Sequence, residues 1–96
     1  MILISGDIHS GGALDSGHNS RFPELSVPHA NIPACTNPTS CKCHTAGDNP
    51  GKWSEGIICG MKNPGYGVVL VRPDLVTLQA KGADGSTRLS IDVQRD

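Results

Sequence analysis

The clearest pattern of hydrophobic and polar positions lies in the last third of the chain. From 76 to 81 and from 88 to 93, apolar residues occupy every second position, and a β-rich run from 66 to 71 precedes them. Because successive side chains of a strand point to opposite faces, this alternation predicts strands with one buried and one wet face. Turn signals at Arg72-Pro73-Asp74 and Asp84-Gly85 join them into an antiparallel meander. The predicted wet face includes Arg88, Ser90 and Asp92.

A second apolar run opens the chain and leads into candidate chemistry. Residues 2–4 are typical of a short buried strand, and Gly6 allows a sharp bend at its end. Asp7 and His9 follow this bend. Ligands of open α/β sheets bind at the carboxyl ends of strands, and a carboxylate with an imidazole suits a divalent metal such as zinc. A structural role is the alternative, in which Asp7 caps a turn and His9 is a surface residue.

The segments between these two patterns are mostly irregular. Residues 11–20, rich in Gly, Ser, Asn and Asp, predict a loop, and residues 22–28, bounded by prolines, predict an edge strand or an extended segment. A short strand is predicted around Ile57-Ile58, and no segment has a clean helical period. We therefore expect a mainly β, small single domain over residues 1–96. It should have an N-terminal strand, a C-terminal three-stranded antiparallel meander, a long metal-binding loop region and little helix.

Four cysteines mark a second candidate metal site. Their spacing is Cys35-x5-Cys41-x-Cys43-His44, followed by Cys59 after the loop region. Zinc bound by all four thiolates, or by three of them with His44, would form a closed structural site. The spacing matches neither the two-residue zinc knuckle nor the plant-type iron–sulfur pattern. Disulfides, with three possible pairings, and free thiols remain alternatives.

The composition limits the classes of function. The net charge of −1, with 18% charged residues, gives no electrostatic footprint for nucleic acid or an anionic membrane surface. With one Trp, one Tyr and one Phe beside 12 Gly and 7 Pro, the core should be thin, so a disulfide, a metal or a partner subunit is expected to stabilise it. No apolar stretch is long enough for a signal peptide or a membrane helix. We therefore expect a cytoplasmic protein with no membrane partner and reduced cysteines.

Several short motifs resemble those of a known enzyme family. Gly6-Asp7-Ile8-His9-Ser10 resembles the last metal-binding motif of calcineurin-like metallophosphoesterases, in the Gly-Asp-x-His form of their PhoD-type alkaline phosphatase/phosphodiesterase branch. Residues 24–31, 53–56 and 63–67 and the terminal hairpin are similar to later stretches of that branch. The family's earlier motifs, Asp-x-His, Gly-Asp and Asn-His followed by Asp or Glu, have no counterpart here. The chain is therefore similar to the C-terminal part of the family's fold.

The resemblance implies a miniature metal-dependent hydrolase of small-molecule phosphoesters, foremost a phosphodiesterase, that uses a metal-activated water. The candidate catalytic residues are Asp7, His9, His18 and His29. The candidate metal ligands are Asp7, His9, Cys35, Cys41, Cys43, His44 and Cys59. Zinc is the expected metal, with manganese or iron as alternatives at Asp7 and His9.

Two ligands hold a metal poorly, so the site should contain further groups. His18, His29, His44 or a residue of a second copy could be the third ligand, and His18 or His29 could instead protonate the leaving group. Arg21 could contact a phosphate oxygen. A homodimer would cover an exposed sheet edge and bring two Asp-x-His pairs together. The alternative function is a non-catalytic zinc-stabilised β-module; redox sensing by Cys41 and Cys43 is a third.

Overall fold

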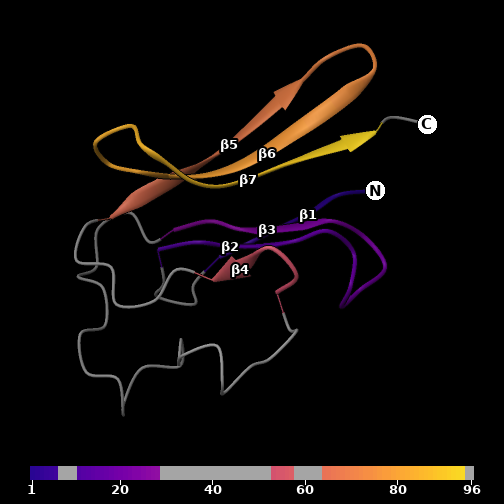
Figure 1. Cartoon of the computed structure of the whole chain (residues 1–96), viewed down its shortest axis with the longest axis horizontal. Coiled ribbons are helices and arrows are strands. Elements are labelled where there is room, and N and C mark those ends of the chain that lie inside the picture. The colour runs from indigo at the N-terminus through magenta and orange to yellow at the C-terminus, as the bar shows by residue number, and fades with distance from the viewer. Residues whose placement is uncertain (7–10, 29–52, 58–63, 95–96) are drawn as a thin grey trace.

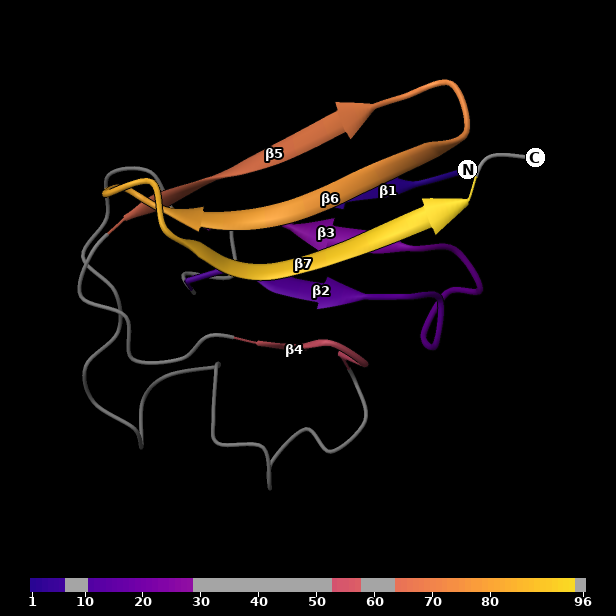
Figure 2. The same cartoon turned by 45° about the horizontal axis from the view of Figure 1, so that its top comes forward.

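The computed structural model describes residues 1–6, 11–28, 53–57 and 64–94, which contain two β-sheets and no helix. The small sheet has the order β1-β3-β2-β4, and its strands are β1 (Leu3–Ser5), β2 (Ala13–Asp15), β3 (Glu24–Ser26) and β4 (Gly56–Ile57). The second sheet, the meander, consists of β5 (Gly65–Val71), β6 (Leu75–Gly82) and β7 (Thr87–Gln94). The two sheets lie over one another as two layers (Figures 1 and 2). The predicted mainly β fold of a small single domain with a C-terminal meander is confirmed.

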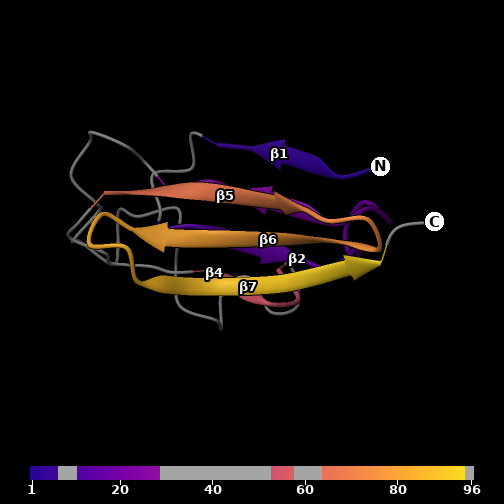
Figure 3. The ribbon, with the colours of Figure 1, turned by 90° about the horizontal axis from the view of Figure 1, so that it is seen from above.

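The meander follows the predicted alternation closely. β6 pairs antiparallel with β5 and β7, which form the two edges of this sheet (Figure 3). The first turn closes through the Arg72 N–H, which donates to the Leu75 carbonyl at 2.9 Å. The second closes through the Gly82 N–H, which donates to the Ser86 carbonyl at 2.9 Å, with Gly85 at a φ of 87°. That positive φ suits glycine, as the Asp-Gly signal predicted.

The small sheet combines one parallel and two antiparallel pairs. β1 runs parallel to β3, whereas β2 is antiparallel to both β3 and β4. The prediction that residues 22–28 form an edge strand or an extended segment is wrong about the edge, because β3 lies between β1 and β2. Pro23 and Pro28 flank β3 outside its paired residues, so neither removes an N–H from the ladder. Pro23 contributes its carbonyl, which accepts from Leu3 N–H at 2.8 Å.

The predicted loop over residues 11–20 contains a strand, β2. This strand is only three residues long, too short to show a periodic pattern in the sequence. Its two neighbours, β3 and β4, hold it from both sides, and all three of its side chains are buried. Tertiary pairing therefore overrides the local preference of this Gly- and Ser-rich segment for a loop.

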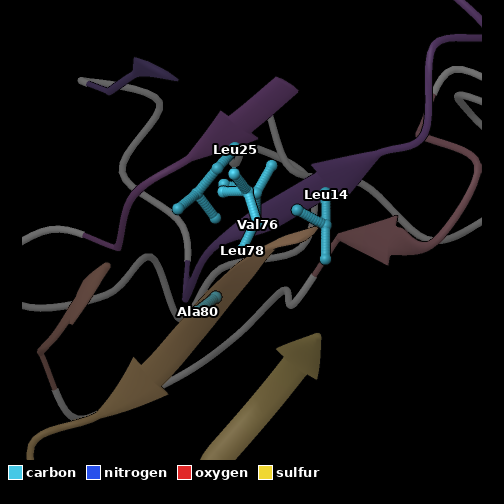
Figure 4. Packing of buried hydrophobic residues seen from close by; sticks show 5 residues of the cluster. All are labelled: Leu14, Leu25, Val76, Leu78 and Ala80. Atoms are coloured by element: carbon cyan, nitrogen blue, oxygen red, sulfur yellow. The ribbon is translucent and has the colours of Figure 1, made fainter. Parts of the chain in front are cut away.

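The hydrophobic core lies between the two sheets. Leu14 and Leu25 point from the small sheet toward the meander, where the buried side chains are Val76, Leu78 and Ala80 (Figure 4). Partly buried side chains surround this cluster: Ile2, Val27, Leu89, Ile91 and Val93. Within the described ranges, this cluster is small.

Candidate functional site

Most of the predicted site residues lie outside the described part of the chain. These residues are Asp7, His9, His29, Cys35, Cys41, Cys43, His44 and Cys59. The structure does describe the strands that directly precede several of them, and it describes His18 and Arg21. Within the described ranges, no three His, Cys, Asp or Glu side chains gather closely enough to hold a metal ion.

One edge of the small sheet collects the relevant strand ends. One residue from each strand of the small sheet belongs to a single row of paired residues. In the order β1-β3-β2-β4, these residues are Ser5, Ser26, Ala13 and Ile57. Three of the strands, β1, β3 and β4, end at this row, and β2 begins there. The Val27 N–H donates to the Ser5 carbonyl at 2.8 Å, which extends the parallel pairing of β1 and β3 beyond the row. We call this side of the small sheet the site edge.

In sequence, the site edge stands next to the candidate ligands. Asp7 and His9 come shortly after β1, His29 comes three residues after the end of β3, and Cys59 comes two residues after the end of β4. Sequence analysis predicted the position of Asp7 and His9 at a strand end, but it did not predict that β3 would be the parallel neighbour of β1. A carboxylate and two imidazoles are a donor set that suits a divalent metal, so the residue types that follow these neighbouring strand ends fit such a group.

His18 and Arg21 lie at the opposite edge. Both belong to the connection 16–23 between β2 and β3, which starts from the row of Leu3, Glu24 and Asp15. Both side chains are exposed. Figure 1 shows this connection at the end of the small sheet where β1 begins, away from the end of β1. The topology therefore does not bring His18 or Arg21 to the site edge.

Gly6 leaves space for a side chain of the neighbouring strand's continuation. Its φ lies outside the left-handed region, whereas Gly12, at the start of β2, has a φ of 114°. A Cβ on Gly6 would lie 3.3 Å from Val27 Cγ2. The missing side chain at position 6 therefore leaves the space that Val27 fills. The predicted bend leads into residues 7–10, which lie outside the described part of the chain.

Polar side chains that sequence analysis missed lie beside the site edge. The Ser5 hydroxyl donates to Glu24 Oε2 at 2.7 Å, across the β1–β3 pair. Ser26 is fully buried, and its hydroxyl has no hydrogen-bond partner in the structure as described. These residues alternate with Leu25, so they lie on the face of the small sheet that points away from the meander. Only the pairing of β1 with β3, which the sequence does not show, places Ser5 beside Ser26.

Asp15 organises the other edge of the small sheet. Its carboxylate is fully buried and accepts from the N–H groups of Ser54, Gly17 and Asn19 at 2.9, 3.1 and 3.1 Å. Burial raises the pKa of Asp15, but these hydrogen bonds together outweigh burial and hold the pKa below its ordinary value. An acid that accepts from three backbone groups at once has a structural role.

No protein-family model, curated protein or solved structure matches the chain. Within the part of the chain that is described, there is also no helix that could cross a membrane.

Proposed function

We propose that the protein is a metal-dependent hydrolase of small-molecule phosphoesters, with phosphodiesters as the preferred class and its site at the site edge. The observation that carries this proposal is the parallel, in-register pairing of β1 and β3, whose ends precede Asp7, His9 and His29 in the sequence. Neighbouring parallel strands present their carboxyl ends at one edge, which is where ligands of such sheets bind. The resemblance of residues 6–10 to a metallophosphoesterase motif supports the reaction class.

The proposed roles follow from residue chemistry. Asp7 and His9 bind the metal through a carboxylate oxygen and an imidazole nitrogen. Of the open candidates for the third group we prefer His29 to His18, because β3 ends at the site edge, whereas the connection 16–23 lies at the opposite edge. His29 either completes the ligand set or protonates the leaving oxygen of the ester.

A divalent metal, when bound, supplies Lewis-acid polarisation of the phosphoryl group and a water of lowered pKa, at about 7 for zinc. The chain's own contribution is to hold the donors in place. The segment with Asp7 and His9 and the segment with His29 start from the ends of β1 and β3. These two ends are held side by side by the hydrogen bonds of one β-ladder. Such preorganisation is worth more to the rate than the mere presence of the donors.

A specific observation also favours the second candidate, a zinc-stabilised β-module without catalysis. Among the described residues, the buried apolar cluster has five members, of which one is an alanine and one a valine. Domains with so small a core usually need a further source of stability. Zinc bound by Cys35, Cys41, Cys43 and Cys59, or by three of them with His44, would provide it.

Single substitutions separate these two functions. We expect Asp7→Ala and His9→Ala each to lower the turnover of an aryl phosphodiester at least about a hundredfold, equivalent to about 2.7 kcal/mol of barrier, while the fold is kept. The measurement is the hydrolysis rate with added Zn²⁺ or Mn²⁺, before and after chelation, with folding checked by circular dichroism. Matched controls are Asp74→Ala in the β5–β6 turn and His18→Ala at the opposite edge, which should keep the wild-type rate.

The double variant Cys41→Ser/Cys43→Ser tests the second candidate in the same assay. The zinc-module function requires that it lose about one metal equivalent and unfold at a lower temperature. If folded Asp7→Ala and His9→Ala both retain the wild-type rate, the hydrolase proposal is wrong. A cysteine variant that then also binds less zinc would establish the module in its place.

A further inference from the structure

One aspartate of the chain is followed by a glycine, and this pair stands in an exposed turn. The pair is Asp84-Gly85, and no asparagine of the chain precedes a glycine. Both residues are exposed in the connection between β6 and β7, with Gly85 at a φ of 87°. At such a pair no Cβ hinders the approach of the aspartate side chain to the next backbone nitrogen. Asp84 is therefore the aspartate of this chain most open to reaction with its own backbone.

The reaction at such a pair is an isomerisation that needs no partner other than water. The Gly85 backbone nitrogen attacks Cγ of Asp84 and forms an N–Cγ bond, and the carboxyl hydroxyl leaves with the N–H proton as water. The cyclic imide then takes up one water and opens at either carbonyl. Opening at the main-chain carbonyl of Asp84 leaves Gly85 linked through Cγ, so the backbone becomes longer by one atom.

In the folded protein, hydrogen bonds engage both reacting groups in other contacts. Asp84 Oδ1 accepts from the Ser86 hydroxyl at 2.7 Å and from the Ser86 N–H at 2.9 Å. These bonds, foremost that of the hydroxyl, hold the pKa of Asp84 below its ordinary value, and an ionised carboxylate loses oxygen less readily than a neutral carboxyl group. The Gly85 N–H donates to the Gly82 carbonyl at 2.9 Å. Ser86 and the turn itself therefore restrain the reaction.

The turn also carries contacts that a longer backbone would disturb. The Gly82 N–H donates to the Ser86 carbonyl at 2.9 Å, which closes the hairpin of β6 and β7. The Ala83 N–H donates to the Pro64 carbonyl at 3.0 Å, which joins the turn to the segment that enters β5. Figure 2 shows this turn beside the start of β5. All three strands of the meander therefore depend on the length of the turn.

Arg88, which follows the turn, extends these contacts to the small sheet. The register of the β6–β7 ladder shifts between Ala80 and Lys81, and Arg88 is the extra residue of this β-bulge. The prediction of Arg88 on the wet face is therefore wrong: its guanidinium reaches the small sheet, where Nη1 donates to the Gly11 carbonyl at 2.9 Å. A change of backbone length before Arg88 would act on this contact between the two sheets as well.

We propose that Asp84-Gly85 is a site of spontaneous isomerisation, that Ser86 restrains the reaction in the folded protein, and that the product loosens the meander. The inference does not depend on the proposed function, because the reacting and restraining residues all lie in one turn of the meander.

The test follows the isomerised fraction at Asp84 during incubation at physiological temperature and neutral pH. Trypsin releases residues 82–88 as one peptide, because Lys81 and Arg88 bound it, and chromatography with mass spectrometry separates its normal and isomerised forms. Asp74, which is exposed in the β5–β6 turn but is followed by Leu75, is the internal control. We expect isomerisation at Asp84 and none at Asp74 over the same time.

Variants of Ser86 test the restraint. We expect Ser86→Ala to isomerise about two- to tenfold faster than the folded wild type, the factor that corresponds to the loss of one net hydrogen bond. Ser86→Thr keeps the hydroxyl and should react like the wild type. Wild-type protein unfolded in urea loses every restraint of the turn and should react at least as fast as Ser86→Ala. The isomerised protein, enriched by longer incubation, should unfold at a lower temperature than fresh protein.

Each step can be contradicted separately. No isomerisation at Asp84 in urea would show that the site is wrong. Equal rates in the folded wild type and in urea, or in folded wild type and folded Ser86→Ala, would overturn the restraint. If circular dichroism shows that Ser86→Ala does not fold, the comparison of folded wild type with wild type in urea still decides. An unchanged unfolding temperature after isomerisation would overturn the effect on the meander.

Discussion

At the scale of single residues, Asp15 illustrates how a buried charge is stabilised. The carboxylate accepts three backbone N–H groups, and its partner Ser54 also accepts from the Ser16 N–H at 2.8 Å. These bonds join the connection after β2 to the segment before β4. Because every donor is neutral, the arrangement favours the ionised form of Asp15 without an opposite charge, which accounts for the lowered pKa.

Asp15 should make the free energy of unfolding depend on pH in the acid range. Its pKa in the folded state is below the ordinary value of 3.8, so the unfolded chain takes up a proton more readily. The stabilisation is therefore complete at pH values above about 4 and is lost as the pH falls through the lowered pKa of the folded state. We expect Asp15→Asn to cost about 2 kcal/mol at neutral pH and to flatten the decline of stability below pH 4.

Urea unfolding at several pH values measures both effects. Asp74→Asn, at an exposed position in the β5–β6 turn, is the matched control and should behave like the wild type. If Asp15→Asn has wild-type stability at neutral pH, the three hydrogen bonds make no net contribution to the free energy of unfolding.

At the scale of elements, two sheets pack closely because glycine stands at their points of contact. A Cβ on Gly67 of β5 would lie 2.5 Å from Val27 Cγ1 and 3.2 Å from Leu25 Cδ2. A Cβ on Gly12 would lie 2.6 Å from the Cβ of Ala80. Glycine is a poor strand former, so its presence in β5 costs local stability that the close approach of the two layers must offset.

Substitution of Gly67 measures that balance. We expect Gly67→Ala to destabilise the protein by about 1–3 kcal/mol, because overpacking outweighs the gain in strand propensity and in unfolded-state entropy. Val71→Thr, on the same strand at a side chain that is 67% exposed, is the control and should change stability by less than about 0.5 kcal/mol. Chemical unfolding gives both values. A Gly67→Ala variant more stable than the wild type would mean that the sheets can separate at this point without cost.

The elements that the sequence predicted well are those whose signals are local. The meander has long alternating runs and two turns with Pro73 and Gly85 in suitable positions, so its strands and order follow from the chain itself. The small sheet has strands of two or three residues that exist only through pairing with distant segments. That is why β2 was predicted as a loop, and why the segment that contains β3 was predicted as an edge strand or an extended segment.

The same distinction applies to the candidate site. The sequence indicated Asp7 and His9 from residue type and from their place after an apolar run. It left His18, His29, His44 and a residue of a second copy open as the third ligand. The choice between His18 and His29 depends on which strand lies parallel to β1. The sequence also placed Arg88 on the solvent face, since no pattern of hydrophobic and polar positions reveals a single inserted residue.

At the scale of the whole molecule, the two edges of the meander differ in charge. β5 carries no charged residue over its length, and Val69, Leu70 and Val71 are well exposed. β7 carries Arg88 and Asp92. In the described part of the chain, no strand pairs with the outer edge of β5. Uncharged, unpaired edge strands readily add a further strand. A second copy of β5 would bring no like charge against the first, and a two-fold pair of such strands is antiparallel.

We therefore retain the prediction of a homodimer and assign its interface to β5. Light scattering at micromolar concentration should give about twice the chain mass of 10.0 kDa. Val69→Lys should shift the protein to a monomer without loss of its β-sheet circular dichroism, because each copy would then bring a lysine close to the middle of the paired strands, where the two like charges repel. Ser90→Lys on the opposite edge strand is the control and should stay dimeric. A monomer at all concentrations in the wild type would contradict the prediction.

β7 has a β-bulge at Arg88, which is one residue more than β6 has at this point of the ladder, and the Arg88 guanidinium donates to the Gly11 carbonyl. A chain shorter by one residue at position 88 would pair Lys81 with the neighbour of Leu89 and complete a regular ladder. The side chains of Leu89, Ile91 and Val93 would still pack against the core. The one additional residue in β7, and not a change in the core, therefore turns the Arg88 side chain from solvent toward the small sheet. A single inserted residue can give a β-hairpin a contact with a neighbouring layer while its own packing stays as it was.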